Sequence, residues 1–214
     1  MEQKRKKPSY IALCLLLTFC GWTAALKFID VQPIGPQGST VGFAKLNQCV
    51  HSFTGVNMPL YVITDWLGLI PVAFGMNFAL LGLVQWIKRR NLKRVDRSIL
   101  ALGGFYIAVM VVYIFFEIVV VNYRPVLING FLEASYPSST TMLTMCVMPT
   151  TVMQLRMRMQ NRILKSCVIT ALIAFTALMV IGRLISGVHW FSDIVGGALL
   201  SAALVKMYCR MAAE

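Results

Sequence analysis

The pair of side chains with the clearest chemical potential in this sequence is His189 and Asp193, four residues apart. At the start of a helix, residues at this spacing lie on one face and can contact each other. A carboxylate that accepts a hydrogen bond from one imidazole nitrogen fixes the tautomer and leaves the other nitrogen free as a nucleophile or base. The pair therefore predicts nucleophilic or acid–base chemistry at a helix N-terminus.

Two arginines and a hydroxyl-rich segment accompany this pair. Arg183 precedes it across a short turn, and Arg124 lies in a separate segment, Asn122-Tyr123-Arg124-Pro125, just outside the third apolar stretch. Guanidinium groups bind phosphate in a bidentate way. The segment Ser138-Ser139-Thr140 follows Pro137 and opens an apolar stretch, so its hydroxyls and free N–H groups would form an anion site at a helix N-terminus. Together these residues predict a site for a phosphoryl group.

The composition places these residues in a membrane protein. Of 214 residues, 58% are hydrophobic and 13% are charged, whereas soluble domains are nearer half apolar and a quarter charged. This content also excludes a disordered chain. A helix needs about 20 mostly apolar residues to span a bilayer. Six stretches qualify: Tyr10 to Leu26, Ile63 to Ile87, Ser98 to Val121, Ser139 to Leu155, Ser166 to Ile185 and Trp190 to Cys209.

The net charge of +12 comes from cations gathered in alternate connections. Sixteen of the 20 Lys and Arg residues lie before the first span, after the second, after the fourth and at the end of the last. This is the positive-inside pattern, which predicts six spans with both termini cytoplasmic. A nucleic-acid partner is not needed to explain the charge. The basic start also resembles a secretory signal, whose removal would leave five spans, but its apolar run is long for a signal.

Charged residues at membrane depth are costly and therefore mark function by default. In this chain they are Asp65, Glu117, Arg183 and Asp193. Arg183 and Asp193 lie, with His189 and Arg124, at the ends of spans on the side without basic loops. The site is therefore expected on the extracytoplasmic face of the cell membrane.

The chain is expected to form one integral-membrane domain over residues 1–214, with the outer loop at about 28–62 as a candidate lid. No CxxC or His/Cys metal spacing is present, and no glycine-rich phosphate loop occurs. We therefore expect neither a metal nor a cofactor.

At these residues the chain resembles the type 2 phosphatidic acid phosphatase (PAP2) superfamily, which shares its core with vanadium haloperoxidases. The family has three motifs, Lys-x6-Arg-Pro, Pro-Ser-Gly-His and Ser-Arg-x5-His-x3-Asp. The third is matched by Arg183, His189 and Asp193, the second in half by Pro137-Ser138-Ser139-Thr140, and the first only by Arg124-Pro125. The resemblance implies an all-α membrane fold, with a core of six helices covering nearly the whole chain.

The resemblance also implies a lipid phosphatase that needs no metal. His189 would attack phosphorus to form a phosphohistidine, and Asp193 would orient it. The phosphoryl oxygens would be held by Arg124, Arg183, Ser138 and the N–H groups near Ser139 and Thr140. Pre-placed cations and donors would then supply most of the catalysis.

Three departures from the motifs affect this expectation. Gly182 replaces the serine before Arg183, and Glu117 replaces the lysine of the first motif, adding an anion that could pair with an arginine. Thr140 replaces the histidine that protonates the leaving group. General acid catalysis is often worth 10²–10⁴-fold, and His51 could supply it only if the outer loop folds over the site.

A phosphate leaving from a diphosphate needs a proton much less than an alkoxide does. The sequence therefore favours a polyprenyl diphosphate, such as undecaprenyl diphosphate, over phosphatidic acid as the membrane substrate. Two alternatives remain open: a catalytically weak or inactive relative that binds phospholipids, and a lipid phosphotransferase. A channel or transporter is least favoured, because the ionisable residues cluster at one face.

Overall fold

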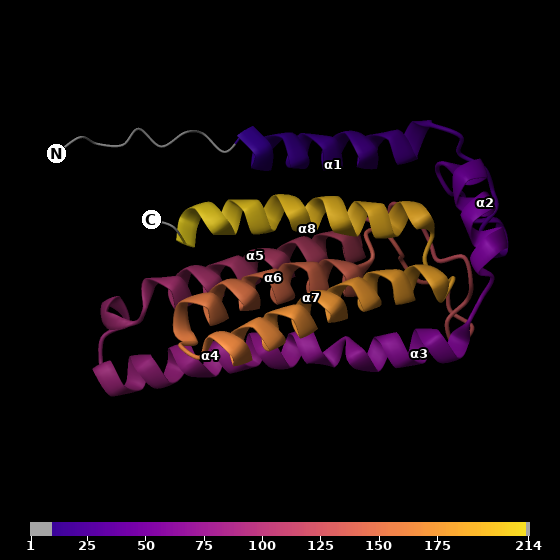
Figure 1. Cartoon of the computed structure of the whole chain (residues 1–214). Helices are drawn as coiled ribbons and strands as arrows, with labels where there is room; N and C mark the ends of the chain where they lie inside the picture. The colour runs from indigo at the N-terminus through magenta and orange to yellow at the C-terminus, as the bar shows by residue number, and fades with distance from the viewer. Residues whose placement is uncertain (1–9, 213–214) are drawn as a thin grey trace.

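The computed structural model describes residues 10–212, which form a bundle of long helices (Figure 1). Within this range only isolated β-bridges occur, so the predicted all-α fold class is confirmed. The α-helices are α1 (Tyr10–Phe28), α2 (Ala44–Thr54), α3 (Met58–Leu67), α4 (Leu69–Arg89), α5 (Arg97–Ile118), α6 (Ser139–Arg158), α7 (Arg162–Ile185) and α8 (Phe191–Ala212). Two short 3₁₀ turns, Pro36–Gly38 and Leu92–Arg94, lie between them.

Five helical segments in the described part of the chain are long and apolar enough to cross a membrane: α1, α3 with α4, α5, α7 and α8. The chain is thus a multi-pass membrane protein. The fourth expected span, Ser139 to Leu155, is helix α6, which is long enough but more polar. It packs against α4, α5, α7 and α8 and buries polar side chains such as Thr144, Thr151 and Gln154. Because α6 faces protein rather than lipid, it needs less apolar surface; the six-span topology stays a prediction.

The second expected span is broken near its start. Helix α3 begins at Met58, five residues before the expected boundary, and ends at Leu67, and α4 resumes at Leu69. Pro71 explains the break, since its ring clashes with the carbonyl four residues earlier and it has no N–H to donate. The break lets α3 pack against α7, which matters for the site described below.

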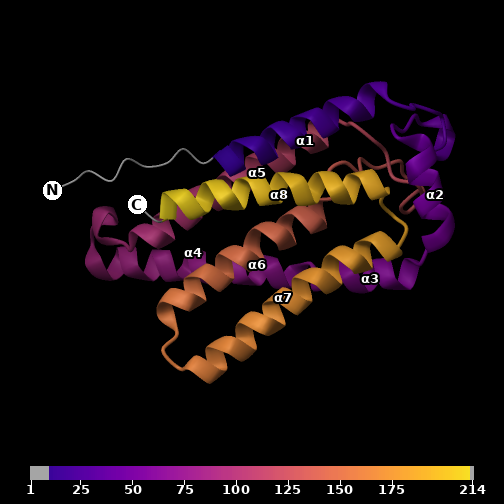
Figure 2. The ribbon, with the colours of Figure 1, turned by 45° about the horizontal axis from the view of Figure 1, so that its top comes forward.

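The main core lies where α1, α5, α6 and α8 meet, and α8 runs between α1 and α6 in both views (Figures 1 and 2). Aromatic rings fill it: Phe19 stacks on Tyr136 with ring centroids 6.3 Å apart, and Phe105 contacts Tyr208 at 5.0 Å. Tyr136 comes from the loop before α6, so this core fixes the start of α6 as well as the helices themselves.

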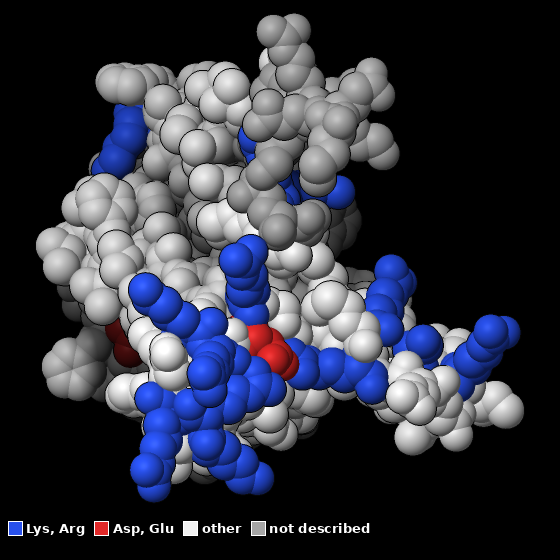
Figure 3. Space-filling view, turned by 90° about the vertical axis from the view of Figure 1, so that its left-hand side faces the viewer, with Lys and Arg blue, Asp and Glu red and all other residues white. Residues whose placement is uncertain are grey.

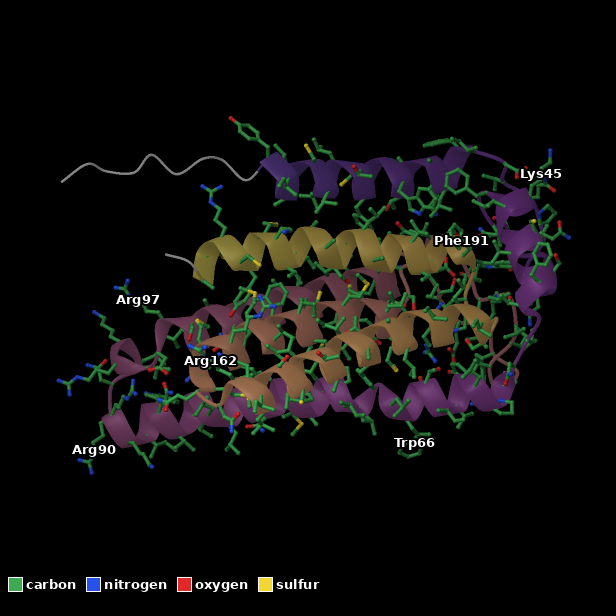
Figure 4. The ribbon with its side chains drawn as sticks, viewed as in Figure 1. Lys45, Trp66, Arg90, Arg97, Arg162 and Phe191 are labelled. Atoms are coloured by element: carbon green, nitrogen blue, oxygen red, sulfur yellow. The ribbon has the colours of Figure 1, made fainter. Side chains whose placement is uncertain are left out.

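Lysine and arginine gather at one end of the bundle (Figure 3). Arg90, Arg97 and Arg162 lie at this end, whereas Lys45 and Phe191 lie at the other (Figure 4). Basic residues 4–7, counted in the predicted pattern, are outside the described residues. The basic loops after α4 and α6 are therefore far from the start of α8, as the charge pattern predicts; which end is cytoplasmic stays a prediction.

The outer segment, expected as a candidate lid, is attached to the start of α8. Helix α2 crosses the end of the bundle between α1 and α3 (Figure 1). Asn47 on α2 is fully buried; its amide donates to the carbonyl of Gly42 and to Ser192 Oγ, and its oxygen accepts from the Ser192 N–H at 3.0 Å. Opening as a lid would have to break these bonds.

A second close approach joins the α2–α3 connection to the turn between α7 and α8. Asn57 N–H donates to the carbonyl of Ser186 at 2.9 Å. Gly187 has φ +68°, and a Cβ there would collide with the carbonyl of Gly55. Glycine is needed at this position for its conformation and for the missing side chain.

Gly187→Ala should therefore destabilise the protein more than an ordinary substitution at positive φ. The left-handed conformation costs an L-residue about 1–2 kcal/mol, and the collision adds to that cost. Gly38→Ala is the matched control, because Gly38 has φ +75° and open space around it. In thermal unfolding of purified protein, Gly187→Ala should lower Tm by several degrees more than Gly38→Ala. Equal shifts would contradict the proposed close packing.

Candidate active site

The predicted site residues lie together at the end of the bundle opposite the basic loops. His189 is in the turn between α7 and α8, and Asp193 is in the first turn of α8. Arg183 is in the last turn of α7, Arg124 belongs to the loop between α5 and α6, and Ser138 is the N-cap residue of α6. Five chain segments thus place their ends around one point.

His189 and Asp193 are both buried and face each other. His189 Nδ1 lies 3.8 Å from Asp193 Oδ2, slightly beyond hydrogen-bond length. Two other groups fix the carboxylate: the Trp190 N–H donates to Oδ2 at 2.9 Å, and Asn122 Nδ2 donates to Oδ1 at 3.3 Å. Asp193 is therefore held behind the imidazole, as the spacing predicts.

The other imidazole nitrogen, His189 Nε2, lies 3.2 Å from Arg124 Nη1. A guanidinium only donates, so Nε2 must accept and the proton must be on Nδ1, toward Asp193. Burial lowers the pKa of His189 to about 4; Arg124 and Arg183 lower it further, while Asp193 opposes the shift. At neutral pH the imidazole is neutral, with its Nε2 lone pair beside an arginine.

Arg183 is held by two helices. Its side chain is 2% exposed; Nη1 donates to the Tyr61 carbonyl at 3.4 Å and to Thr64 Oγ1 at 3.3 Å. Nη2 donates to Asp65 Oδ1 at 3.3 Å and to Thr140 Oγ1 at 2.7 Å. The first three partners are on α3 and Thr140 is on α6, so the broken helix α3 supplies most of the site that receives Arg183.

The Tyr61 ring links the two arginines. The guanidinium carbon of Arg183 lies 4.8 Å from the ring centroid and that of Arg124 lies 5.9 Å from it. A cation over an aromatic face is attracted by the ring quadrupole, which reduces the cost of placing two like charges together. The motif pattern gave no indication of Tyr61 or Thr64, whereas Asp65 was marked as a carboxylate inside an apolar span.

The start of α6 completes the site. The Ser138 N–H donates to the Asp193 carbonyl at 3.1 Å. Within residues 10–212, Ser138 Oγ and Arg183 Nε are buried without a hydrogen-bond partner. Buried donors without partners are uncommon in folded proteins, and both would be satisfied by the oxygens of a phosphoryl group.

The two arginines already pair with carboxylates, but not with the expected one. Arg124 Nε lies 3.1 Å from Glu133 Oε2, and Arg183 pairs with Asp65. Among residues 10–212 the two arginines thus pair with Glu133 and Asp65, and neither pairs with Glu117. Glu117 instead lines a narrow pocket together with His189, because it ends α5 on the other side of this pocket.

His51, the second histidine, lies on α2 with its ring 5.5 Å from that of Trp190, the neighbour of His189. Burial lowers its pKa from the ordinary value. The structure thus brings His51 to the edge of the site on the His189 side; a role as acid stays a prediction.

A large apolar groove opens from the site between α4, α5 and α6, with a volume of about 1070 Å³. Its polar end is formed by Asp65, Ser139 and Thr140, and it extends along α4 to Trp86. Ser139 also borders the narrow pocket that contains His189. The groove and the nucleophile pocket thus meet at the start of α6.

Among the described residues, no three His, Cys, Asp or Glu side chains are grouped so that they could hold a metal ion. The chemistry available to these residues is nucleophilic attack by a neutral imidazole on a group held by two guanidiniums and a helix N-terminus. An anionic phosphorus centre is the electrophile that this arrangement suits.

Comparisons with known proteins agree with this description. Residues 119–214 match the family model of the PAP2 superfamily. Among curated protein sequences, none matches the chain. In fold, the chain is similar to the crystal structure of "the first transmembrane PAP2 type phosphatidylglycerolphosphate phosphatase from Bacillus subtilis", with a TM-score of 0.57 and 18% identity, over 94% of this chain and 95% of that one. The matched segment contains His189, Asp193 and both arginines, and it confirms the resemblance to the PAP2 superfamily over this part of the chain.

Proposed function

We propose that the protein is a membrane lipid phosphatase in which His189 attacks the phosphorus of a phosphate or diphosphate lipid. One observation carries the proposal: His189 Nε2 accepts from Arg124 at 3.2 Å while Asp193 lies behind Nδ1. The same nitrogen is thus unprotonated and lies beside a phosphate-binding cation, which would turn to the phosphoryl oxygens when substrate binds. The site is proposed to face the extracytoplasmic side, because the basic loops lie at the opposite end of the bundle.

In the first half-reaction, the Nε2 lone pair forms the bond to phosphorus, and the bond from phosphorus to the leaving oxygen breaks. The leaving group departs with that electron pair. The resulting imidazolium carries the phosphoryl group, and Asp193 beside Nδ1 stabilises its positive charge. In the second half-reaction, water attacks phosphorus and the P–N bond breaks, which returns a neutral His189 and releases phosphate.

The transition state gathers negative charge on the three oxygens that neither attack nor leave. We propose that these oxygens are bound by Arg124, Arg183, the Ser138 hydroxyl and the N–H groups at the start of α6. These donors are fixed before substrate binds, since Arg183 is held by α3 and Ser138 by Asp193. Fixed donors in a buried site cost no reorganisation during the reaction.

The apolar groove is proposed to hold the hydrocarbon tail of the substrate. It begins at Ser139 and Thr140, beside the phosphoryl site, and reaches Trp86 along α4. From Gly68 to Trp86, a helix rises ~27 Å at 1.5 Å per residue, close to the ~30 Å thickness of the bilayer hydrocarbon. A lipid can therefore keep its tail at membrane depth while its headgroup enters the site.

A polyprenyl diphosphate, for example undecaprenyl diphosphate, is the favoured substrate because Thr140 cannot act as an acid. Its hydroxyl accepts a 2.7 Å hydrogen bond from Arg183, and an alcohol is a weak acid at neutral pH. Phosphate is a good leaving group without protonation. The phosphatase of similar fold is named for a phospholipid monoester, phosphatidylglycerolphosphate. Turnover of the diphosphate should therefore be compared with turnover of phosphate monoesters.

Purified protein should release phosphate from a polyprenyl diphosphate faster than from phosphatidic acid or phosphatidylglycerolphosphate. His189→Ala should reduce turnover of all three by about 10³-fold or more, the scale seen when a nucleophile is removed. Rapid quenching in alkali should trap a phosphohistidine only when His189 is present. Faster turnover of phosphatidic acid would overturn the diphosphate preference, and unchanged turnover in His189→Ala would overturn the mechanism.

The second candidate is a protein that binds phospholipid without hydrolysing it. The observation that favours it is Thr140, which stands in place of the acid histidine. In that case the native chain would bind phospholipid without turnover, and Thr140→His would create activity. A lipid phosphotransferase would be recognised in the same assay, because the phosphoryl group would appear on an added alcohol instead of in free phosphate.

The titration of His189 provides a test that does not need a substrate. The chain has only two histidines, so their imidazole signals can be followed by NMR in detergent and assigned with His51→Gln. We expect His189 to titrate near pH 4 and to stay neutral at pH 5.5, where an ordinary histidine is mostly protonated. In Arg124→Gln the pKa of His189 should rise, because a neighbouring cation is removed. A value near 6.5 would contradict the buried neutral nucleophile.

Blocking the groove should weaken binding of long-chain substrates only. Gly103 lines the groove with open space where a side chain would be. Gly103→Phe should raise KM for a long-chain substrate about tenfold, equivalent to losing two methylene contacts at ~0.8 kcal/mol each. It should leave KM for p-nitrophenyl phosphate unchanged. Gly21→Phe on α1, also in open space but outside the groove, is the control; an equal effect from it would argue against tail binding.

A further inference from the structure

Thr140 stands where the family motif has the histidine that protonates the leaving group. A carboxylate, Asp65, lies beside Thr140 in the structure. Asp65 Oδ1 and Thr140 Oγ1 both accept from the same nitrogen, Arg183 Nη2, at 3.3 and 2.7 Å. Both residues also line the polar end of the groove. The Asp65 side chain is 58% exposed, so it can contact a molecule that enters from the groove.

We propose that Asp65 is the general acid that protonates the leaving oxygen of monoester substrates, in place of the missing histidine. This inference rests on the proposed function, with His189 as the nucleophile and the tail in the groove. It makes Asp65 the residue that decides whether the enzyme accepts phosphate monoesters in addition to diphosphates.

The two cavities give the geometric reason. In-line displacement puts the leaving oxygen on the side of phosphorus opposite the nucleophile. His189 lines the narrow pocket, Asp65 and Thr140 line the groove, and Ser139 borders both. A phosphoryl group bound at the start of α6 therefore has His189 on one side. On its other side it has Asp65 and the exit for the lipid tail.

The other carboxylates near the site are less well placed for this role. Glu117 lines the pocket that contains His189, on the nucleophile side. Asp193 lies 3.8 Å from His189 Nδ1 and accepts two hydrogen bonds from other groups. Glu133 pairs with Arg124 and comes from the loop before α6. Asp65 is the carboxylate among these four that lines the tail groove.

A bound phosphoryl group would take over the ion-pair partner of Asp65. Asp65 Oδ1 lies 3.3 Å from Arg183 Nη2, and the phosphoryl oxygens would bind the same guanidinium. Asp65 is then released to face the leaving oxygen, and the proposed step uses its protonated form.

The proton balance closes over the two half-reactions. As the P–O bond breaks, the leaving oxygen keeps the electron pair and takes the Asp65 proton, releasing an alcohol and leaving a carboxylate. Asp65 then accepts a proton from the water that attacks the phosphohistidine. The products are the alcohol, hydrogen phosphate, neutral His189 and protonated Asp65, so the net reaction consumes one water.

The test compares substrates that differ in their need for a proton. Phosphatidic acid has an alkoxide leaving group, whereas p-nitrophenyl phosphate has a stabilised phenolate and needs little assistance. Asp65→Asn should lower kcat on phosphatidic acid by about 10²–10³-fold, within the range for general acid catalysis. It should lower kcat on p-nitrophenyl phosphate by less than about tenfold. Asp65→Glu, which keeps a carboxylic acid, should retain more phosphatidic acid turnover than Asp65→Asn.

Two further variants make the comparison specific. Asp65→Asn combined with Thr140→His should recover phosphatidic acid turnover, since an acid is restored at the neighbouring position. Glu117→Gln is the matched control, because it removes a carboxylate on the nucleophile side. Any change in kcat that it causes should be the same factor for phosphatidic acid and p-nitrophenyl phosphate. The assignment is supported if Asp65→Asn lowers kcat more on phosphatidic acid than on p-nitrophenyl phosphate and Glu117→Gln does not.

Three results would overturn it. Equal losses on both substrates in Asp65→Asn would mean that Asp65 only holds Arg183. Unchanged phosphatidic acid turnover in this variant would mean that no acid acts there. A wild-type enzyme that hydrolyses diphosphate but no monoester would mean that Asp65 does not protonate. Failure of the proposed function would look different: turnover of every substrate would be absent or insensitive to His189→Ala.

Discussion

Burial of the Arg183 guanidinium is the constraint on which the site depends. A charged group at 2% exposure is tolerated only when partners replace its water. α3 supplies three of them, from Tyr61, Thr64 and Asp65, and Thr140 on α6 supplies another. This requirement explains why α3 packs against α7. The position of one cation thus fixes the ends of three helices.

The same constraint governs the electrostatics of the site. Arg124 pairs with Glu133 and Arg183 with Asp65, while Asp193 lies beside His189 and Glu117 lines the same pocket as His189. Carboxylates therefore outnumber the cations. A phosphoryl group must therefore compete with Asp65 and Glu133 for the guanidiniums. Both of those carboxylates are more exposed than the arginines they bind, at 58% and 42% against 2% and 10%. They can turn into solvent or toward a ligand, whereas the guanidiniums keep their places.

Much of this organisation could be predicted from residue types and spacing. The fold class, the position of α6 as a helix opening at Ser139, and the meeting of Arg124, Arg183, His189 and Asp193 all follow from periodicity, charge pattern and motif order. The contributions of Tyr61, Thr64 and Glu133 could not be found this way. They depend on how a broken helix and an irregular loop pack in three dimensions, and no sequence spacing relates α3 to α7.

The departures from the family motifs are connected through Arg183. Thr140 Oγ1 accepts from Arg183 Nη2 at 2.7 Å, which a protonated histidine could not do because it has no acceptor. A histidine at this position would therefore have to release Arg183 or stay neutral. The chain with threonine instead binds Arg183 more fully and holds a carboxylate, Asp65, on the same nitrogen. Under the proposed mechanism, Thr140 and the carboxylate on α3 are therefore parts of one arrangement: the hydroxyl holds the cation, and the cation keeps Asp65 beside the leaving group.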